Sequence, residues 1–410
     1  MAELTRTEEA AARSAPPTRV VTALRITGIY VAGRILTLVF LYIASALAAP
    51  GSRFGPGLGI ERFITGWDGQ WYWQIAFQGY PSPLPLTDTG AVAENAWAFM
   101  PIYPWVANAV GMPFGSWATG AGITSLVCGL LSCFALYRLM RNRLSRNASM
   151  WAVVFFANGP LAALFHVGYA EAMFTLFLLL ALNAVLRRRF AELYVLVPLM
   201  GFTRPGILPF ALMLGLYGIW RWFRRDRDPL PRAQIIHILA TGALAVLVGF
   251  SWQIIAGIVT GDPGAYLSTE LAWRRNWLAE PATAFIPFEA WGAALNMWFG
   301  LWQVPVILGW ITFAVLLALI AWALLRERHV LAMGVELRLW SASYILYLLA
   351  VFFPQSSTLR LLLPLTPMVG ALAIPRSPWW RGGILIGGVL YQWFWIYSVY
   401  ALAATVYQIP

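Results

Sequence analysis

Long apolar runs recur along almost the whole chain, and this recurrence constrains the fold more than any other feature. Only 11% of the residues are charged, whereas ordinary soluble domains carry about 25%. A helix needs about 20 apolar residues to cross a membrane, and crossing segments are helical because lipid cannot satisfy an open backbone. The sequence predicts an all-α polytopic membrane protein with about 11 transmembrane helices, near 22–49, 117–140, 149–165, 170–186, 191–203, 205–223, 233–259, 301–325, 335–354, 360–375 and 382–405.

The arginines predict the orientation of these segments. All 28 basic residues are arginine, and most lie in short connections between apolar runs. Connections rich in arginine remain in the cytoplasm. With a cytoplasmic N-terminus, 21 of the 28 arginines lie inside, six lie outside, and Arg34 falls within the first run. We therefore predict a multi-pass protein of a bacterial plasma membrane, with its C-terminus and active site on the outer face. Because the arginines are dispersed, the net charge of +11 does not indicate binding to nucleic acid.

The same topology divides the chain into a tail and one membrane domain. Residues 1–21 are predicted to be a disordered cytoplasmic tail, because they are polar and lack the apolar core of a signal peptide. Residues 22–410 form a single transmembrane domain with two long outer loops, at about 50–98 and 260–300. These loops contain eight acidic residues: Glu61, Asp68, Asp88, Glu94, Asp262, Glu270, Glu280 and Glu289. The chemistry of the protein is therefore expected on the outer side.

Asp68 is the most informative of these acids. It lies among the aromatic residues Trp67, Trp71, Tyr72 and Trp73, which are typical of a membrane interface. An ionisable group at the edge of the hydrocarbon is costly and indicates a function. The alternative is that Asp68 caps an interfacial helix.

Other polar residues fall at the predicted outer ends of the spans: His166, Tyr169 and Glu171, then Thr203, Arg204, Pro205 and Gly206, and finally Gln355, Ser356, Ser357, Thr358 and Arg360. Arg204 and Arg360 are candidate phosphate ligands, because guanidinium groups offer forked donors to phosphate oxygens. Each arginine could instead extend to lipid headgroups. His166 could be a packing residue, and Glu171 could stabilise a helix N-terminus.

An outward-facing transferase requires a lipid-linked donor, because soluble nucleotide sugars are not available outside a bacterial membrane. Such a site needs a base for the acceptor hydroxyl, cations for a phosphate leaving group, and an apolar groove for a lipid tail. We expect one outer pocket with Asp68 and at least one of Arg204 and Arg360 on its wall. The sequence contains no nucleotide-phosphate loop, metalloprotease motif or cysteine cluster.

Several motifs, in order, resemble those of PIG-V-type mannosyltransferases (the GPI mannosyltransferase 2 type), which belong to the GT-C class of glycosyltransferases dependent on polyprenyl-phosphate sugars. They are Trp67-Asp68-Gly69, Ile75-Ala76 with Gly79-Tyr80, Ala98 to Pro104, Gly168-Tyr169-Ala170-Glu171, Thr203-Arg204-Pro205-Gly206, and Arg360 with Pro364 and Pro367. Glu270 and Trp273 resemble a Gln-x-x-Trp element of the family, with glutamate in place of glutamine. The aromatic residue that usually follows the late arginine is absent.

The resemblance implies a GT-C-type fold and an inverting mannosyltransferase that uses a polyprenyl-phosphate-mannose donor. It implies that Asp68 is the general base, while Arg204 or Arg360 neutralises the departing phosphate. His166, from its place at an outer helix end, is a further candidate phosphate ligand. The acceptor would be a glycolipid or glycan. Candidate contacts to the donor or acceptor sugar are Trp67, Gly69, Tyr72, Tyr169, Glu171, Glu270 and Trp273. No cofactor is required, although a divalent metal remains possible.

Two other functions remain open at this point. The donor could carry arabinofuranose or glucose, or the acceptor could be a protein. The chain could instead be a flippase or transporter for lipid-linked sugars. The predicted accumulation of acids on the outer side disfavours transport, because transport sites lie near the middle of the bilayer.

Overall fold

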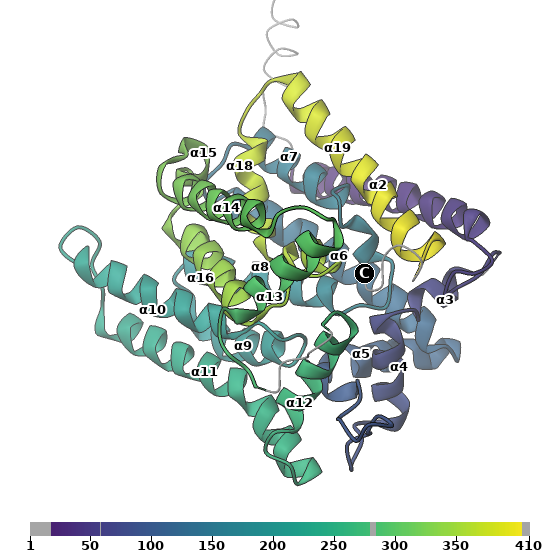
Figure 1. The fold of residues 1–410 in the computed structure, drawn as a ribbon. Coiled ribbons are helices and arrows are strands. Elements are labelled where there is room, and N and C mark those ends of the chain that lie inside the picture. The colour runs from purple at the N-terminus through teal and green to yellow at the C-terminus, as the bar shows by residue number, and fades with distance from the viewer. Residues whose placement is uncertain (1–17, 58, 279–283, 404–410) are drawn as a thin grey trace, which may run out of the picture.

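In the computed structural model, which describes residues 18–57, 59–278 and 284–403, the protein is a bundle of helices (Figure 1). The described part contains one isolated β-bridge, between Leu86 and Val92, and no longer strand. The prediction of an all-α chain is therefore confirmed for these residues. Five helical segments are long and apolar enough to cross a membrane: α2 (Arg19–Leu47), α6 (Trp117–Met140), α11 (Arg232–Thr260), α14 (Val306–Arg326) and the continuous stretch Pro378–Ala401, which comprises α19 (Pro378–Ile396) and the π-helix η7 (Tyr397–Ala401).

Each of the other predicted runs is also helical, but in shorter pieces. They correspond to α7 (Arg146–Ala157) with η3 (Ala162–Phe165), α8 (Glu171–Leu186), α9 (Leu193–Gly201), α10 (Leu208–Phe223), α16 (Val335–Val351), and the series α17 (Thr358–Leu361), η6 (Leu363–Met368) and α18 (Val369–Ala373). The number of complete crossings therefore stays a prediction. The structure differs from the sequence prediction at the N-terminus, because α2 already begins at Arg19, inside the predicted tail. Residues 1–17 and Glu280 lie outside the described residues.

Helix α8 lies in the core of the bundle, where it packs against α6 and α9. Nearly all of its residues are buried, including Glu171 at its first position. Helix α10 pairs with α11 at one edge of the bundle, whereas α2 and α19 pack together at the other edge (Figure 1). The N-terminus of α8, which carries Glu171, is thus held inside the bundle.

The two predicted outer loops fold into short helices, several of which lie in the lower part of Figure 1. The first loop contains α3 (Ile60–Ile64), α4 (Asp68–Gln78) and η1 (Ala96–Ala98), and it leads into α5 (Ile102–Gly111). The second contains α12 (Ala265–Ala272), η5 (Trp273–Asn276) and α13 (Glu289–Leu301). Asn95 donates to the hydroxyl of Thr269 at 2.9 Å and Trp71 packs on Trp273, so the two loops contact each other.

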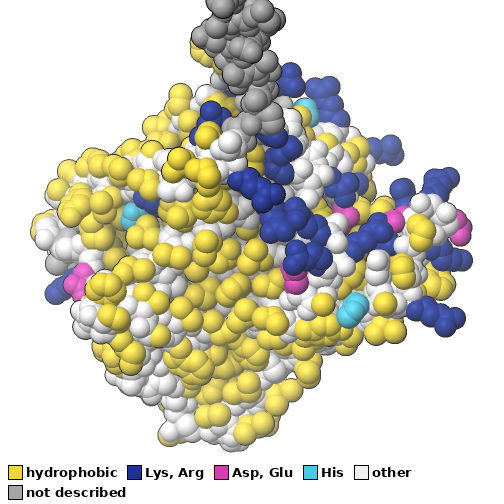
Figure 2. All heavy atoms as spheres, turned by 180° about the vertical axis from the view of Figure 1, so that it is seen from behind, with side chains coloured by type: hydrophobic (Ala, Val, Ile, Leu, Met, Phe, Trp, Pro, Cys, Tyr) yellow, Lys and Arg dark blue, Asp and Glu magenta, His cyan; other side chains and the backbone are white. Residues whose placement is uncertain are grey.

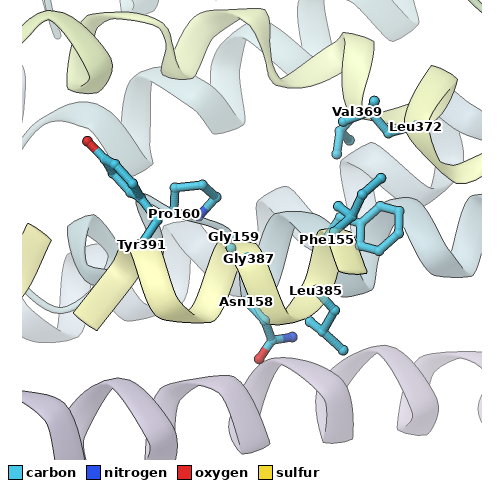
Figure 3. Close-up of a pocket in the computed structure, with 11 residues that line it drawn as sticks. Phe155, Asn158, Gly159, Pro160, Val369, Leu372, Leu385, Gly387 and Tyr391 are labelled. Atoms are coloured by element: carbon cyan, nitrogen blue, oxygen red, sulfur yellow. The ribbon is translucent and has the colours of Figure 1, made fainter. Parts of the chain in front are cut away.

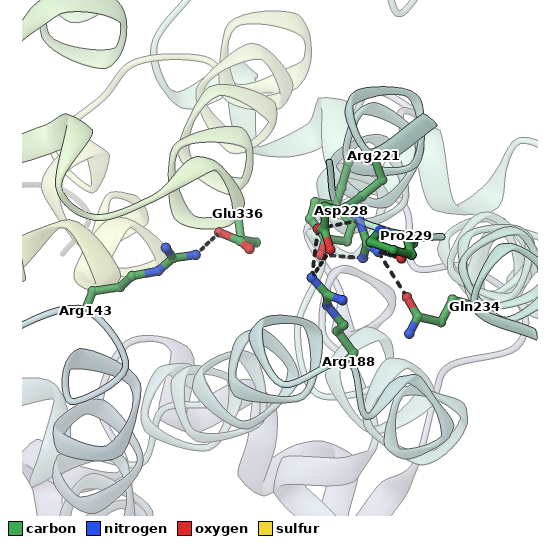
Figure 4. Close-up of polar contacts among 8 residues, drawn as sticks. Arg143, Arg188, Arg221, Asp228, Pro229, Gln234 and Glu336 are labelled. Carbon is green, nitrogen blue, oxygen red and sulfur yellow. Dashed lines mark hydrogen bonds and ion pairs between the residues drawn. The ribbon is translucent and has the colours of Figure 1, made fainter. Parts of the chain in front are cut away.

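Arginine-rich connections gather in another region of the molecule. Figure 2 shows a band of basic side chains on the rear face, which runs from the top of the view toward its right-hand edge, with a broad hydrophobic surface to the left and below. Figure 4 shows the ion pairs and hydrogen bonds that join such connections. Arg143 contacts Glu336 at 2.9 Å, while Arg188 and Arg221 both contact Asp228. Connections that the arginine pattern places on the cytoplasmic side thus contact one another.

Candidate functional site

Asp68 is the first residue of α4, directly after a strained turn. Trp67 has φ 53°, a left-handed conformation that costs a non-glycine residue about 1–3 kcal/mol. This conformation is supported by a hydrogen bond from the Trp67 indole to the carbonyl of Val399, at 3.1 Å, and by the guanidinium of Arg53 over its ring. Trp67, not Asp68, occupies the N-cap position. The helix-cap interpretation of Asp68 is therefore wrong.

The carboxylate of Asp68 instead pairs with Arg360, 292 residues further along the chain. Arg360 Nη1 donates to Asp68 Oδ2 at 2.5 Å. A hydrogen bond between a guanidinium and a carboxylate is charge-assisted and stronger than one between neutral groups. Sequence reasoning expected Asp68 and at least one of the two arginines at one site, and the structure brings Asp68 and Arg360 into direct contact.

Two glycines, Gly69 and Gly168, allow the start of α4 and the segment before α8 to pack closely together. A Cβ atom on Gly69 would lie 2.4 Å from the carbonyl oxygen of Ile64, and one on Gly168 would lie 2.6 Å from the same oxygen. The amide of Gly168 donates to that oxygen at 3.0 Å. The start of α4 and the segment before α8 therefore pack on one backbone group, which places Asp68 beside Glu171.

Glu171 extends the ion pair into a cluster of four charges. Its Oε1 atom lies 3.5 Å from Nε of Arg360 and 3.6 Å from Nε of Arg204. Asp68, Arg360, Glu171 and Arg204, which we call the four-charge cluster, thus alternate in sign and sum to zero charge. The side chain of Glu171 is 3% exposed and that of Asp68 is 16% exposed. Asp68 is therefore the most accessible member of the cluster.

Arg204 is held by a second bridge. It follows α9 and precedes Gly206, whose φ of 123° favours glycine. The hydroxyl of Tyr344 lies beside Arg204 and donates to the carbonyl of Leu361 at 2.7 Å. Since Leu361 follows Arg360, Tyr344 links the two arginine-bearing segments. Tyr344 lies inside an apolar run without a local motif, and sequence reasoning missed it.

The surroundings of Asp68 favour a carboxylate that can accept a proton. Burial raises the pKa of Asp68 above its usual range, and the negative charge of Glu171 acts in the same direction. The positive charge of Arg360 opposes this shift but is the smaller effect. A carboxylate with a raised pKa is a stronger general base than an exposed one.

Aromatic side chains enclose the cluster. The guanidinium of Arg360 lies over the ring of Tyr169, 5.3 Å from its centre, and Tyr72 packs edge-on against Phe99. Trp71 stacks on Phe99, and its ring lies edge-on to that of Trp273, with 5.8 Å between the ring centres. Trp71, Phe99 and Trp273, which we call the aromatic wall, thus join α4 to the second outer loop. Sequence reasoning proposed Tyr72, Tyr169 and Trp273 but did not assign a role to Trp71.

The remaining candidate residues have other partners. His166 lies 3.3 Å from Nη1 of Arg34, and Arg34 donates to the carbonyls of Ala157 and Ala162. The structure thus places His166 with Arg34, whereas its predicted role required contact with the donor phosphate near Arg204 and Arg360. Glu270 hydrogen-bonds Tyr266 on the same helix, and burial raises the pKa of Glu270 to about 7.

No metal site is evident within the described ranges. They contain no group of three or more histidine, cysteine, aspartate or glutamate residues placed to hold an ion. In the four-charge cluster, each carboxylate forms an ion pair with a guanidinium group: Asp68 with Arg360, and Glu171 with Arg204.

Two apolar cavities lie elsewhere. One, of about 300 Å³, lies between α7, α18 and α19, where Phe155, Pro160, Leu385 and Tyr391 form part of its wall (Figure 3). The other, of about 340 Å³, lies between α2 and α6 and includes Arg34 and His166 in its lining. Asp68, Arg204 and Arg360 line neither cavity, so these two cavities do not correspond to the expected outer pocket.

Comparisons with known proteins give similarity in overall fold only. No protein-family model and no curated protein sequence matches this chain. Among solved structures, the oligosaccharyltransferase AglB from Archaeoglobus fulgidus, in complex with an inhibitory peptide and a dolichol-phosphate, is 13% identical with a TM-score of 0.44, over 91% of this chain and 56% of its own. ArnT from Cupriavidus metallidurans, bound to undecaprenyl phosphate, is 16% identical with a TM-score of 0.48, over 88% of this chain and 63% of its own. This chain therefore spans less than two thirds of the length of either protein.

Proposed function

We propose that this protein is an inverting GT-C-type membrane glycosyltransferase. It moves a mannosyl residue from a polyprenyl-phosphate-mannose donor to a hydroxyl of a glycolipid or glycan on the outer face of the membrane. The observation that carries the proposal is the 2.5 Å pair of Asp68 and Arg360, which lies in one cluster with Arg204. A base and two phosphate-binding cations are the polar groups that this reaction needs.

In the proposed reaction, Asp68 accepts the proton of the acceptor hydroxyl while that oxygen attacks the anomeric carbon. The new carbon–oxygen bond forms on the face opposite the phosphate, and the bond from the anomeric carbon to the phosphate oxygen breaks. Its electron pair leaves with the polyprenyl phosphate, so the anomeric configuration inverts. Arg204 and Arg360 stabilise the charge that develops on this leaving group.

Arg360 has a double role in this proposal. Its Nη1 atom is engaged by Asp68 in the structure, and a phosphate oxygen would compete for the same donor. Donor binding therefore draws Arg360 toward the phosphate and frees Asp68 to contact the acceptor hydroxyl. The aromatic wall and Glu270 border the same outer region, and we assign to them contacts with the sugars.

The test is a transfer assay with the purified protein in lipid nanodiscs. The protein is incubated with polyprenyl-phosphate mannose and a membrane lipid extract, and the product is identified by mass and by the configuration of its anomeric carbon. Parallel reactions contain the glucose and arabinofuranose donors. Mannose transfer with inversion supports the proposal. Transfer only from another donor, transfer with retention, or movement of intact donor across the bilayer would contradict it.

A further inference from the structure

The two carboxylates of the four-charge cluster contact Arg360 at different atoms. Asp68 accepts from Nη1, at the end of the guanidinium. Glu171 approaches Nε, on the inner edge, and the same carboxylate oxygen approaches Nε of Arg204. Glu171 therefore occupies the inner edges of both guanidinium groups and leaves their ends to other partners.

From this geometry we propose that Glu171 is a positioning residue that braces Arg204 and Arg360 into a single phosphate-binding pair. The inference rests on the proposed function and deepens it, because it assigns Glu171 a structural task in the phosphate site in place of a sugar contact. Two buried guanidinium groups repel each other, and a shared carboxylate offsets that repulsion. Without the brace, the two groups separate and cannot contact one phosphate together.

Burial makes the brace strong. Glu171 is 3% exposed and lies at the first position of α8, inside the bundle. Arg204 and Arg360 come from two other segments of the chain and are 10% and 9% exposed. Since a buried carboxylate is costly without partners, Glu171 holds the two arginines as firmly as they hold it.

The proposal makes a prediction opposite in sign to simple electrostatics. Removal of a negative charge from an anion site should strengthen phosphate binding if charge alone matters. If Glu171 braces the arginines, its removal weakens binding. Glu171→Gln keeps the size of the side chain and removes the charge, so this variant separates the brace from a pure charge effect.

A matched control exists at the opposite end of the molecule. Glu336 is also buried and is paired with Arg143 at 2.9 Å. Glu336→Gln removes a buried carboxylate from a comparable ion pair that is not part of the four-charge cluster. It reports the general cost of losing such a pair.

The experiment measures the dissociation constant of polyprenyl phosphate for the full chain in nanodiscs, without any transfer step. We expect Glu171→Gln to weaken binding about 10- to 100-fold, because the variant loses the buried ion contacts of Glu171 to Nε of Arg204 and Nε of Arg360. Arg204→Ala should weaken it similarly, and the double variant should lose little more, because the two residues act as one unit. Glu336→Gln should bind as the wild type does.

Unchanged or tighter binding by Glu171→Gln would overturn the proposal, as would an equal loss in Glu336→Gln. If Glu171→Gln does not fold, Glu171→Asp decides, because the shorter side chain keeps the charge but cannot reach both Nε atoms. Weaker binding by that variant supports the brace and unchanged binding contradicts it. A wild type that does not bind polyprenyl phosphate would also overturn the proposal. A wild type that binds it but transfers no mannose would contradict the proposed function alone.

Discussion

Arg360 is the residue on which the site depends, because it is shared between Asp68 and Glu171. The Asp68 contact occupies a donor that the phosphate needs, whereas the Glu171 contact does not. The same kind of substitution should therefore have opposite effects on phosphate binding at these two positions.

We predict that Asp68→Asn strengthens the binding of polyprenyl phosphate by about five- to tenfold, since a competitor for Arg360 is removed. The measurement is the same nanodisc titration, compared directly with Glu171→Gln. Weaker binding by Asp68→Asn would show that Asp68 does not compete with the phosphate.

Glu270 provides a pH-dependent contribution to stability. Burial raises its pKa from 4.5 to about 7, although Tyr266 and Arg274 oppose the shift. The folded protein therefore holds this proton more tightly than the unfolded chain, and ionisation destabilises the fold. The stabilisation that the protonated Glu270 gives to the folded protein is fully present below pH about 4.5, and it is lost as the pH rises through about 7.

We expect the melting temperature of Glu270→Gln, relative to wild type, to rise as the pH is increased from 5 to 8, because the variant has no carboxyl group to ionise at this position. Thermal unfolding in nanodiscs across this pH range measures the difference. A constant difference would mean that Glu270 titrates alike in the folded and unfolded protein.

At the scale of elements, the junction of α4 with the segment before α8 aligns the two carboxylates. Gly69 and Gly168 both approach the carbonyl of Ile64 too closely for a side chain. Any added atom must push α4 away from α8 and lengthen the contact between Asp68 and Arg360.

We predict that Gly69→Ala and Gly168→Ala each destabilise the protein by about 1–3 kcal/mol, the usual cost of overpacking, and reduce transfer about tenfold or more, because small displacements of catalytic groups are costly. Gly215→Ala is the control, because a Cβ atom at that helical glycine would meet no neighbour within 4 Å. Normal transfer by both variants would contradict the proposed role of this junction.

The helices that sequence patterns locate best are those with strong boundary signals. The run predicted at 117–140 matches α6, which begins after the capping residue Ser116. The run at 149–165 is predicted as one segment, but it breaks after Ala157, where Arg34 from α2 binds the free carbonyls. A break caused by a side chain from another helix has no local signature in the sequence.

In the candidate site too, the sequence predicts what has a local signal and misses what depends on contacts between distant segments. Asp68 can be identified from the sequence because a lone carboxylate among interfacial aromatic residues is costly unless it has a function. The bridging roles of Glu171 and Tyr344 depend on contacts among segments far apart in the chain, and these contacts exist only after the helices have packed. The prediction for His166 rests on its place in the sequence, but its side chain faces Arg34.

At the scale of the whole molecule, the ion pairs agree with the predicted topology. Among the described residues, each pair joins two positions predicted on the same side of the membrane: on the outer side Asp68–Arg360, Glu171–Arg360 and Glu171–Arg204, and on the cytoplasmic side Arg143–Glu336, Arg188–Asp228, Arg221–Asp228, Arg189–Glu192 and Glu327–His329. This agreement supports the order of crossings, while the direction relative to the cell stays a prediction.

That direction can be measured with single cysteines at exposed sites in the two kinds of connection. We expect Asp88→Cys to react with a membrane-impermeant maleimide in intact cells, and Arg225→Cys to react only after the cells are opened. The native Cys128 and Cys133 are buried and contribute little background. The reverse pattern of labelling would place the four-charge cluster on the cytoplasmic side and contradict the account.

The most direct test of the central claim is the turnover number of Asp68→Asn for mannosyl transfer at saturating polyprenyl-phosphate mannose. Because a general base typically contributes about 10²–10⁴-fold, we predict that turnover falls by this factor while the variant remains folded and membrane-inserted. Glu336→Gln, assayed alongside, should retain the wild-type value. Near-normal turnover by Asp68→Asn would remove Asp68 from the chemistry and contradict the proposed mechanism.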